Sequence, residues 1–445
     1  MPKFKLRTLC CVAGLALCYA HVAMADDDDH GSKGHRNGDM KGNAVQVGSR
    51  PAFLVNGMDS SPLKRRLKQC HGGPFYRTDF SIGHRGAALQ FPEHTEESYR
   101  AAASQGAGII ECDATFTNDG ELVCRHAQCD LHTTTNIITT DLNAECTVPW
   151  DPENPNPGSV KCCASDLSLA EFKTLKGKMD GSNPNANTAD EFMGGTVTWR
   201  TDLYTSRGTV LSHKDSIRLI RELGAKFTPE LKAPDPNARV QVEDVFGSRE
   251  AYAQKLIDDY KEFDVDPRDV WAQSFSFEDV QYWIDNEPRF GRQAVYLDGR
   301  YSGSNAIDPV DGDPATFVPT MEEIAAKGVQ ILAPPIHFLL TVRDDGKIVP
   351  SKYARAAKSA GLDIVAWTFE RSDLRNGSRT GVDANGKPTA TFYFAFDVNP
   401  NAQAINKDSD MYKALDILAR KVGILGIFSD WPATVTFYAN CMGLK

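Results

Sequence analysis

Residues 109–126 read IIECDATFTNDGELVCRH. The segment begins as an apolar strand, places Glu111 and Asp113 two residues apart, turns at residues 118–120 and returns to His126. Side chains two residues apart on a strand lie on the same face. Two like charges on one face of a buried strand are costly unless positive charge lies between them. The stretch therefore predicts a cation, or basic side chains, beside these carboxylates.

The apolar start of this stretch belongs to a repeating pattern of short strands and amphipathic helices. The predicted strands are residues 80–85, 108–113, 225–232, 269–275, 293–298, 329–335, 363–369 and 424–430. This alternation predicts an α/β fold, a (β/α)8 TIM barrel, which needs about 250 residues before insertions. A doubly wound open sheet is the rival, but no Gly-rich dinucleotide fingerprint follows a predicted strand.

The predicted helices lie between these strands and carry start and stop signals. They are residues 95–106, 213–224, 248–263, 320–328, 351–361 and 410–423. Thr95 is in the position of an N-terminal cap, with Ser98 at the third helical position. Gly224 is placed to end the second of these helices.

Polar and charged side chains recur where the predicted strands end, which is where barrel enzymes build their active sites. They are His84, Arg85, Glu111, Asp113, Glu230, Lys232, Gln273, Trp367 and Asp430. A fold alone does not require charge at the same end of several strands. We therefore expect these residues to surround one cavity.

Three of these side chains are hard oxygen donors. Glu111, Asp113 and Glu230 form a ligand set of the kind that Ca²⁺ or Mg²⁺ takes, and a cation would remove their mutual repulsion. No thiolate or close histidine pair accompanies them, which disfavours a softer metal. The alternative is that Arg85 and Lys232 neutralise the carboxylates through ordinary salt bridges.

Two histidines are expected at the mouth of the barrel. His84 ends the first strand, and the turn after the second strand brings the chain back to His126. Two imidazoles on opposite sides of a substrate suit general base and general acid chemistry near neutral pH. Arg85 and Lys232 are natural phosphate partners, Arg through its two-pronged guanidinium and Lys as a point charge.

Two segments depart from the repeat. Residues of about 127–210 and 371–409 are rich in Pro, Asn and Gly, with little periodicity. Long connections without helices or strands are uncommon in compact domains and are often functional. We interpret both segments as loop insertions over the C-terminal mouth of the barrel.

The N-terminal residues and the cysteines indicate export. Residues 1–25 have a basic start, an apolar run and the small-residue ending Ala23-Met24-Ala25 of a signal peptide, and residues 26–50 form a polar tail expected to be disordered. Three of the 11 cysteines lie in the leader; the other eight are Cys70, Cys112, Cys124, Cys129, Cys146, Cys162, Cys163 and Cys441. An even number in an exported chain predicts disulfides, with the cluster from residue 124 to residue 163 as the expected place and the connectivity left open. Cys112 is expected to face away from the carboxylates and to pack or form a disulfide.

Residues 80–432 resemble the glycerophosphodiester phosphodiesterase family. The likeness rests on the order of IGHRG, PEHT, the E-x-D strand, the DG turn and strand ending in His, TPELK, AWTF and IFSDWP. It implies that residues 51–445 form a TIM-barrel phosphodiesterase domain that hydrolyses glycerophosphodiesters to sn-glycerol 3-phosphate and an alcohol with a divalent cation. Carried over by motif, the acid/base pair is His84 and His126, and the metal ligands are Glu111, Asp113 and Glu230. Arg85 and Lys232 are expected to hold the phosphate and Trp367 to line the glycerol pocket. Gln273, from its place at a strand end, is a further expected substrate contact.

Three residues depart from the pattern of that family. His94 replaces the usual Asn, Ala127 replaces the Asp that follows the second histidine, and His132 replaces an Arg. The resemblance therefore leaves the metal affinity and the pH optimum open.

Two other functions fit the same residues. One is hydrolysis of lysophospholipids or another large phosphodiester, aided by the aromatic segment TFYFAF in the second insertion. The other is a catalytically weak exported protein that binds a partner with the same fold. The net charge of −10 without a basic run disfavours a nucleic-acid partner, so the expected partner is a small phosphodiester. No transmembrane segment is expected in the mature chain, and no oligomeric state is predicted.

Overall fold

The computed structural model describes residues 45–197, 199–201, 208–372, 392–394 and 404–445. The described residues belong to one unit, Asn43–Lys445. The predicted signal peptide, residues 1–25, and most of the predicted tail, residues 26–50, lie outside the described residues.

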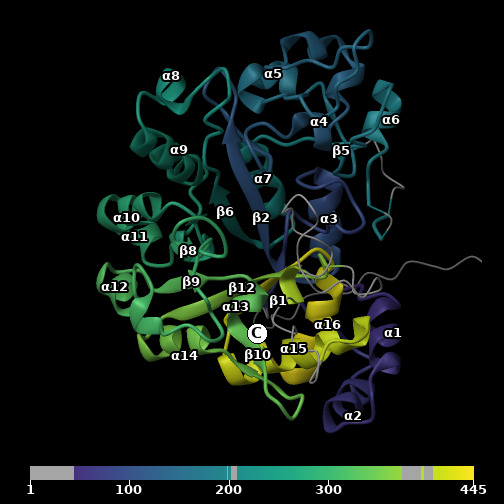
Figure 1. Cartoon of the computed structure of the whole chain (residues 1–445), viewed down its shortest axis with the longest axis vertical. Coiled ribbons are helices and arrows are strands. Elements are labelled where there is room, and N and C mark those ends of the chain that lie inside the picture. Colours follow the sequence, from purple (N-terminus) through teal and green to yellow (C-terminus); the bar gives the residue numbers. More distant parts are fainter. Residues whose placement is uncertain (1–44, 198, 202–207, 373–391, 395–403) are drawn as a thin grey trace, which may run out of the picture. The chain divides into compact units, whose positions relative to one another are not determined.

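Parallel strands close into a barrel (Figure 1). In chain order they are β1 (Thr78–Gly83), β2 (Ala107–Phe116), β6 (Lys226–Leu231), β7 (Gln273–Ser274), β8 (Val295–Leu297), β9 (Ile331–Ala333), β12 (Asp363–Phe369) and β13 (Gly426–Ser429). The barrel closes because β1 pairs with both β13 and β2. Each strand overlaps the range predicted from the sequence, so the prediction of a TIM barrel is confirmed.

Helices follow the barrel strands and pack on their outer side. They are α3 (Glu96–Ser104), α7 (His213–Glu222), α9 (Arg249–Glu262), α10 (Phe277–Asn286), α12 (Met321–Ala326), α14 (Lys352–Ser359), α15 (Met411–Ile417) and α16 (Pro432–Met442). The predicted ends of two helices are confirmed. The Thr95 side chain accepts a hydrogen bond from the Ser98 N–H at the start of α3, and Gly224 follows α7 with a φ of 66°.

Shorter elements complete the described fold. They are the hairpin β10 (Leu340–Val342) and β11 (Ile348–Pro350), and the helices α8 (Val242–Phe246), α11 (Pro288–Gly291) and α13 (Ile336–Leu339). Strand β3 (Leu122–Cys124) runs antiparallel beside the carboxyl half of β2. This pairing, set by the tight turn at residues 118–120, brings His126 back towards the carboxyl end of the barrel.

The first insertion is more ordered than its composition predicts. It contains α4 (Leu131–Thr134), α5 (Leu169–Phe172), β4 (Lys176–Gly177), α6 (Ala189–Met193) and β5 (Gly208–Thr209). These elements bury a small core of their own, which includes Ile137, Trp150 and Phe192. Two disulfides, Cys129–Cys163 and Cys146–Cys162, tie the segment together. Elements of two to five residues are too short to leave a periodic signal in the sequence.

The N-terminal part contains two helices that the sequence analysis did not predict, α1 (Arg50–Gly57) and α2 (Pro62–Gln69). A disulfide from Cys70 to Cys441 joins the end of α2 to α16. Ahead of α1, the Gln46 N–H donates to the Ser104 carbonyl at 2.8 Å, so the last residues assigned to the polar tail lie against the barrel. Among the described residues, no helix combines the length and apolar composition needed to cross a membrane.

Candidate active site

A cavity of about 400 Å³ opens at the carboxyl ends of the barrel strands. Eight of the nine predicted site residues line it: His84, Arg85, Glu111, Asp113, His126, Glu230, Gln273 and Trp367. Lys232 does not line the cavity but contacts a residue that does, with its ammonium 2.5 Å from a carboxylate oxygen of Glu230. The cavity also has wall residues that the sequence analysis did not select, namely Phe275, Leu297, Tyr301, Thr368, Arg371, Tyr393 and Phe428.

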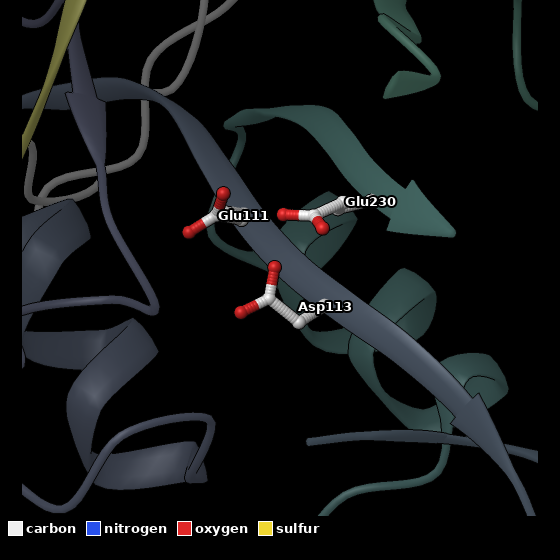
Figure 2. Close-up of side chains that lie close together, drawn as sticks. All are labelled: Glu111, Asp113 and Glu230. Atoms are coloured by element: carbon white, nitrogen blue, oxygen red, sulfur yellow. The ribbon is translucent and has the colours of Figure 1, made fainter. Parts of the chain in front are cut away.

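The three predicted carboxylates meet in this cavity. Glu111 and Asp113 project from the same face of β2, and Glu230 projects from the neighbouring strand β6 (Figure 2). Asp113 and Glu230 are partners in the parallel register of the two strands. One oxygen from each of the three carboxylates lies within 4.8 Å of the others, and all three residues are buried.

This arrangement places unfavourable negative charge in the barrel. Burial, and then repulsion from Asp113 and Glu230, raises the pKa of Glu111 well above its usual range. Burial is also the main cause that raises the pKa of Glu230, to about 7. Burial opposes ionisation of Asp113 too, but Lys232 and His94 hold its pKa well below the usual range. Of the three carboxylates, Asp113 is the one at which neighbouring positive charge outweighs the effect of burial on the pKa.

The donor set fits a hard divalent cation. The Asp113 Oδ1 atom is buried and has no hydrogen-bond partner among the described residues, whereas buried acceptors are ordinarily satisfied. All three side chains offer oxygen, which suits Ca²⁺ and Mg²⁺. The intervening Cys112 is joined to Cys124 in a disulfide in the core outside the barrel, as predicted, and offers no thiolate.

His84 is held by an aspartate from the last barrel strand. Its Nδ1 lies 2.5 Å from Oδ1 of Asp430, and its Nε2 lies on the cavity side, 3.9 Å from Glu111 Oε2. Burial lowers the pKa of His84 to about 4, against the opposing influence of Asp430. The sequence analysis predicted that Asp430 ends the last strand but assigned it no partner. Because the last strand of a closed barrel pairs with the first, the predicted fold could have indicated a contact between Asp430 and His84.

His126 lies two residues after the end of β3 and is half-buried in the cavity wall. Burial, and then the positive charges of Arg85 and Lys232, lowers the pKa of His126 well below its usual value. The structure thus brings the two predicted histidines to the same cavity, beside the three carboxylates.

Arg85 is the cation closest to the carboxylates on the cavity wall. Its backbone is left-handed, with a φ of 56°, and its N–H donates to Glu111 Oε2 at 2.9 Å. Its guanidinium lies 2.8 Å from Glu93 Oε2 and 3.5 Å from Asp113 Oδ2. Strained backbone at a non-glycine residue is typical of functional sites, because the surrounding fold must enforce it.

The two other predicted substrate contacts are fixed by hydrogen bonds. The Gln273 side-chain amide donates to Glu111 Oε1 at 3.0 Å, and the Trp367 indole donates to the Ala333 carbonyl at 2.7 Å. Trp367 is the centre of an aromatic group, with ring centroids 5.8 Å from Phe275 and 6.1 Å from Tyr301. This group gives the cavity an apolar part of its wall, besides the charged part.

The three residues that depart from the family pattern have different places. His94 is fully buried and bridges Asp113 Oδ2, at 2.8 Å, and the Tyr99 hydroxyl, at 3.0 Å, so it supports a carboxylate of the cluster. The Ala127 N–H donates to Asp130 Oδ2 at 3.0 Å. His132 lies in the insertion, stacked on Phe192 and away from the cavity lining.

The closed parallel barrel, with acidic and imidazole side chains gathered at the carboxyl ends of its strands, defines a TIM-barrel enzyme. Residues 84–434 match the family model described as "Glycerophosphoryl diester phosphodiesterase family". The chain belongs to this family and is a phosphoric diester hydrolase, which confirms the predicted family and enzyme class.

Three known proteins are similar to this chain. The chain is 43% identical over 267 residues to an "Extracellular protein" of Arthroderma benhamiae, a match that covers 60% of this chain and 100% of that protein. It is 49% identical over 47 residues to "Probable glycerophosphodiester phosphodiesterase 1" of Mycobacterium tuberculosis, which is 11% of this chain and 17% of that protein. A crystal structure from Silicibacter pomeroyi, described as "Putative glycerophosphoryl diester phosphodiesterase", has 17% identity and a TM-score of 0.51, with 85% of this chain and 98% of that chain covered, and so has the same fold.

Proposed function

We propose that the protein hydrolyses glycerophosphodiesters to sn-glycerol 3-phosphate and an alcohol, with Ca²⁺ or Mg²⁺ held by Glu111, Asp113 and Glu230. The observation that carries the proposal is the buried, unpartnered Oδ1 of Asp113 within a cluster of three carboxylates beside two histidines. A divalent cation bound there supplies positive charge that neutralises a phosphodiester and lowers the pKa of a coordinated hydroxyl or water.

The remaining roles follow from the positions of the side chains. Arg85 binds the phosphate from the cavity wall. Lys232, which contacts Glu230 outside the lining, adds positive charge near the phosphate. One of His84 and His126 takes the proton of the nucleophile, and the other protonates the leaving alcohol oxygen. Burial lowers the pKa of both imidazoles, which favours the neutral form that a base needs, and the neighbouring carboxylates stabilise the imidazolium form that an acid needs.

The apolar wall of the cavity is the natural place for the organic parts of the substrate. Trp367 contacts the glycerol, as the resemblance implies, and Gln273 holds Glu111 in place from β7, which is separated from β2 by β6. Tyr393, from the segment TFYFAF, also lines the cavity, and this observation favours large phosphodiesters such as lysophospholipids as a second substrate class.

We propose that the protein acts outside the cell. Three observations support export: the signal-like residues 1–25, the four disulfides in the described part of the chain, and the likeness to a relative named "Extracellular protein". Disulfides persist in oxidising compartments.

The test is release of sn-glycerol 3-phosphate from glycerophosphocholine by the purified mature chain. The protein is first treated with EDTA, then assayed alone and with added Mg²⁺ or Ca²⁺. We expect turnover that chelation removes and that one of the two ions restores. Glu230→Gln should abolish this turnover. Glu222→Gln, which changes an exposed carboxylate at the last residue of α7, should leave it unchanged. A parallel assay with lysophosphatidylcholine measures the second substrate class. Absence of turnover with every ion and both substrates would contradict the proposal.

A further inference from the structure

Charged side chains from four separate segments meet around Asp430. Its Oδ1 faces His84 Nδ1 at 2.5 Å, while its Oδ2 accepts hydrogen bonds from Arg371 at 2.9 Å and from Arg200 at 3.4 Å. Asp180 pairs with Arg200 and lies 3.5 Å from Arg371. Arg200 and Asp180 belong to the first insertion, so the insertion reaches the residue that holds His84.

The centre of the cluster is buried, Arg371 and Asp180 at its edge are partly exposed, and the cluster is electrically balanced. Asp430 is fully buried, the Arg200 side chain is 4% exposed, and two guanidiniums face two carboxylates. A buried carboxylate without partners is costly, and breaking one buried pair leaves the other charge uncompensated. Although burial opposes it, Arg371 and His84 hold the pKa of Asp430 well below its usual value.

Backbone hydrogen bonds anchor the same part of the insertion. The Thr201 N–H donates to the Leu89 carbonyl at 3.2 Å, and the Leu89 N–H donates to the Asp430 carbonyl at 3.0 Å. The segment around Arg200 is therefore docked on the loop between β1 and α3, which also carries His84. The side chain of Asp430 contacts this segment directly through Arg200, and its backbone is connected to it through Leu89.

The contact with Asp430 determines which ring nitrogen of His84 carries the proton. An ionised carboxylate only accepts hydrogen bonds, so the proton of a neutral His84 must be on Nδ1, facing Asp430. Its Nε2 then carries the lone pair and faces the cavity. Which ring nitrogen is free is set by the hydrogen bond that the other nitrogen makes.

We propose that Arg200 is a positioning residue for catalysis, which fixes Asp430 and, through it, the orientation and tautomer of His84. The insertion is then part of the catalytic apparatus. This inference rests on the proposed role of His84 in proton transfer. A merely structural Arg200 would affect the free energy of unfolding but not the turnover of the folded enzyme.

A double-mutant cycle tests the coupling between Arg200 and Asp430. We expect Arg200→Ala to lower kcat by about tenfold with a much smaller change in KM, a size reached by coupling within one hydrogen-bonded network. In an Asp430→Asn background the same change should alter kcat less than about twofold, because the positioned carboxylate is already absent. Arg200→Lys should restore part of the loss, since it returns the charge without the second donor. Equal effects of Arg200→Ala in the two backgrounds, or an unchanged kcat, would overturn the proposal.

The matched control is Lys161→Ala. Lys161 also joins the insertion to the barrel, through a 3.0 Å ion pair with Asp235 that does not involve Asp430, and its loss should leave kcat unchanged. A loss of kcat as large as that of Arg200→Ala would mean that loosening the insertion in any way is sufficient, which would overturn the specific role of Arg200.

Nitrogen-15 NMR of the histidine rings tests the same inference without turnover. We expect His84, assigned by its absence in His84→Asn, to show the pattern of an imidazole protonated on Nδ1, and Arg200→Ala to shift it towards the other tautomer. An Nε2-protonated ring in the wild type, or an identical spectrum in Arg200→Ala, would contradict the proposal. A wild-type protein without turnover would contradict the proposed function, while this spectrum would still decide the role of Arg200.

Discussion

Asp113 and Glu230 face each other across the parallel pair β2 and β6, and their carboxylates converge with that of Glu111. The convergence depends on strand register, because a slip of one residue would turn Glu230 to the other face of the barrel wall. The β2–β6 pairing extends without a break from Ile109 to Ala114, which fixes that register. The fold thus holds three acidic groups together in a position that is unfavourable without a cation.

The histidine pair gives the first prediction. We expect His84→Ala and His126→Ala each to lower kcat by about 10²–10⁴-fold, because each removes one proton transfer. Steady-state release of sn-glycerol 3-phosphate measures the effect, with circular dichroism to verify folding. His71→Ala, at an exposed residue of the N-terminal part, is the control and should leave kcat unchanged. Rates within about threefold of wild type in either site variant would refute the assigned roles.

The second prediction contrasts two disulfides. Cys112–Cys124 links β2, which carries two of the carboxylates, to β3, which leads to His126. We expect the double change Cys112→Ala with Cys124→Ala to lower the free energy of unfolding by about 2–4 kcal/mol and also to lower kcat, because the two strands lose their cross-link. Urea unfolding and turnover per folded molecule are measured together.

Cys70–Cys441 provides the comparison, since it joins residues 371 apart in the sequence and lies outside the cavity lining. Its removal should also destabilise the protein, by about as much or more, because it closes a longer loop. The kcat of the folded fraction should stay at the wild-type value. Equal loss of kcat in the two double variants would show that stability, and not the link between β2 and β3, determines the effect.

The third prediction concerns acid sensitivity of the first insertion. Burial lowers the pKa of His132 from 6.5 to about 4, and its Nδ1 accepts a hydrogen bond from the Cys162 N–H at 3.3 Å. Between these two values the unfolded chain binds a proton here that the folded chain does not, so stability rises with pH in this window. The contribution is complete above pH 6.5 and is lost as the pH falls towards 4.

Denaturant unfolding of wild type and His132→Gln at several pH values measures this contribution. Gln retains an acceptor for the Cys162 N–H but does not titrate. We expect wild type to lose more stability than the variant between pH 6.5 and pH 4, and His71→Ala to behave as wild type. Parallel pH profiles for wild type and His132→Gln would contradict the prediction.

The barrel could be predicted from the sequence because its strands, although some have only two or three residues, lie within apolar runs of six to eight residues between capped helices. The ten residues of β2 are all buried, so their pattern is continuous and clear. The cavity residues followed because parallel strands end at one edge, where Glu111, Asp113 and Glu230 indeed meet.

What could not be predicted depends on contacts between distant segments. Asp430 meets His84 only because the last strand closes on the first, and Arg200 joins them because its segment is docked on the loop between β1 and α3. Helices α1 and α2 were missed because their eight-residue segments have few buried residues and are held by tertiary contacts such as the Arg50–Glu370 ion pair.

Calorimetric titration of the chelator-treated protein with Ca²⁺ and with Mg²⁺ tests the central claim most directly. We predict one site per chain for at least one of these ions in wild type and in Glu222→Gln, and loss of that site in Asp113→Asn and in Glu230→Gln, because each change removes a charged ligand from the cluster. Binding of neither ion to wild type, or undiminished binding in both site variants, would contradict the account.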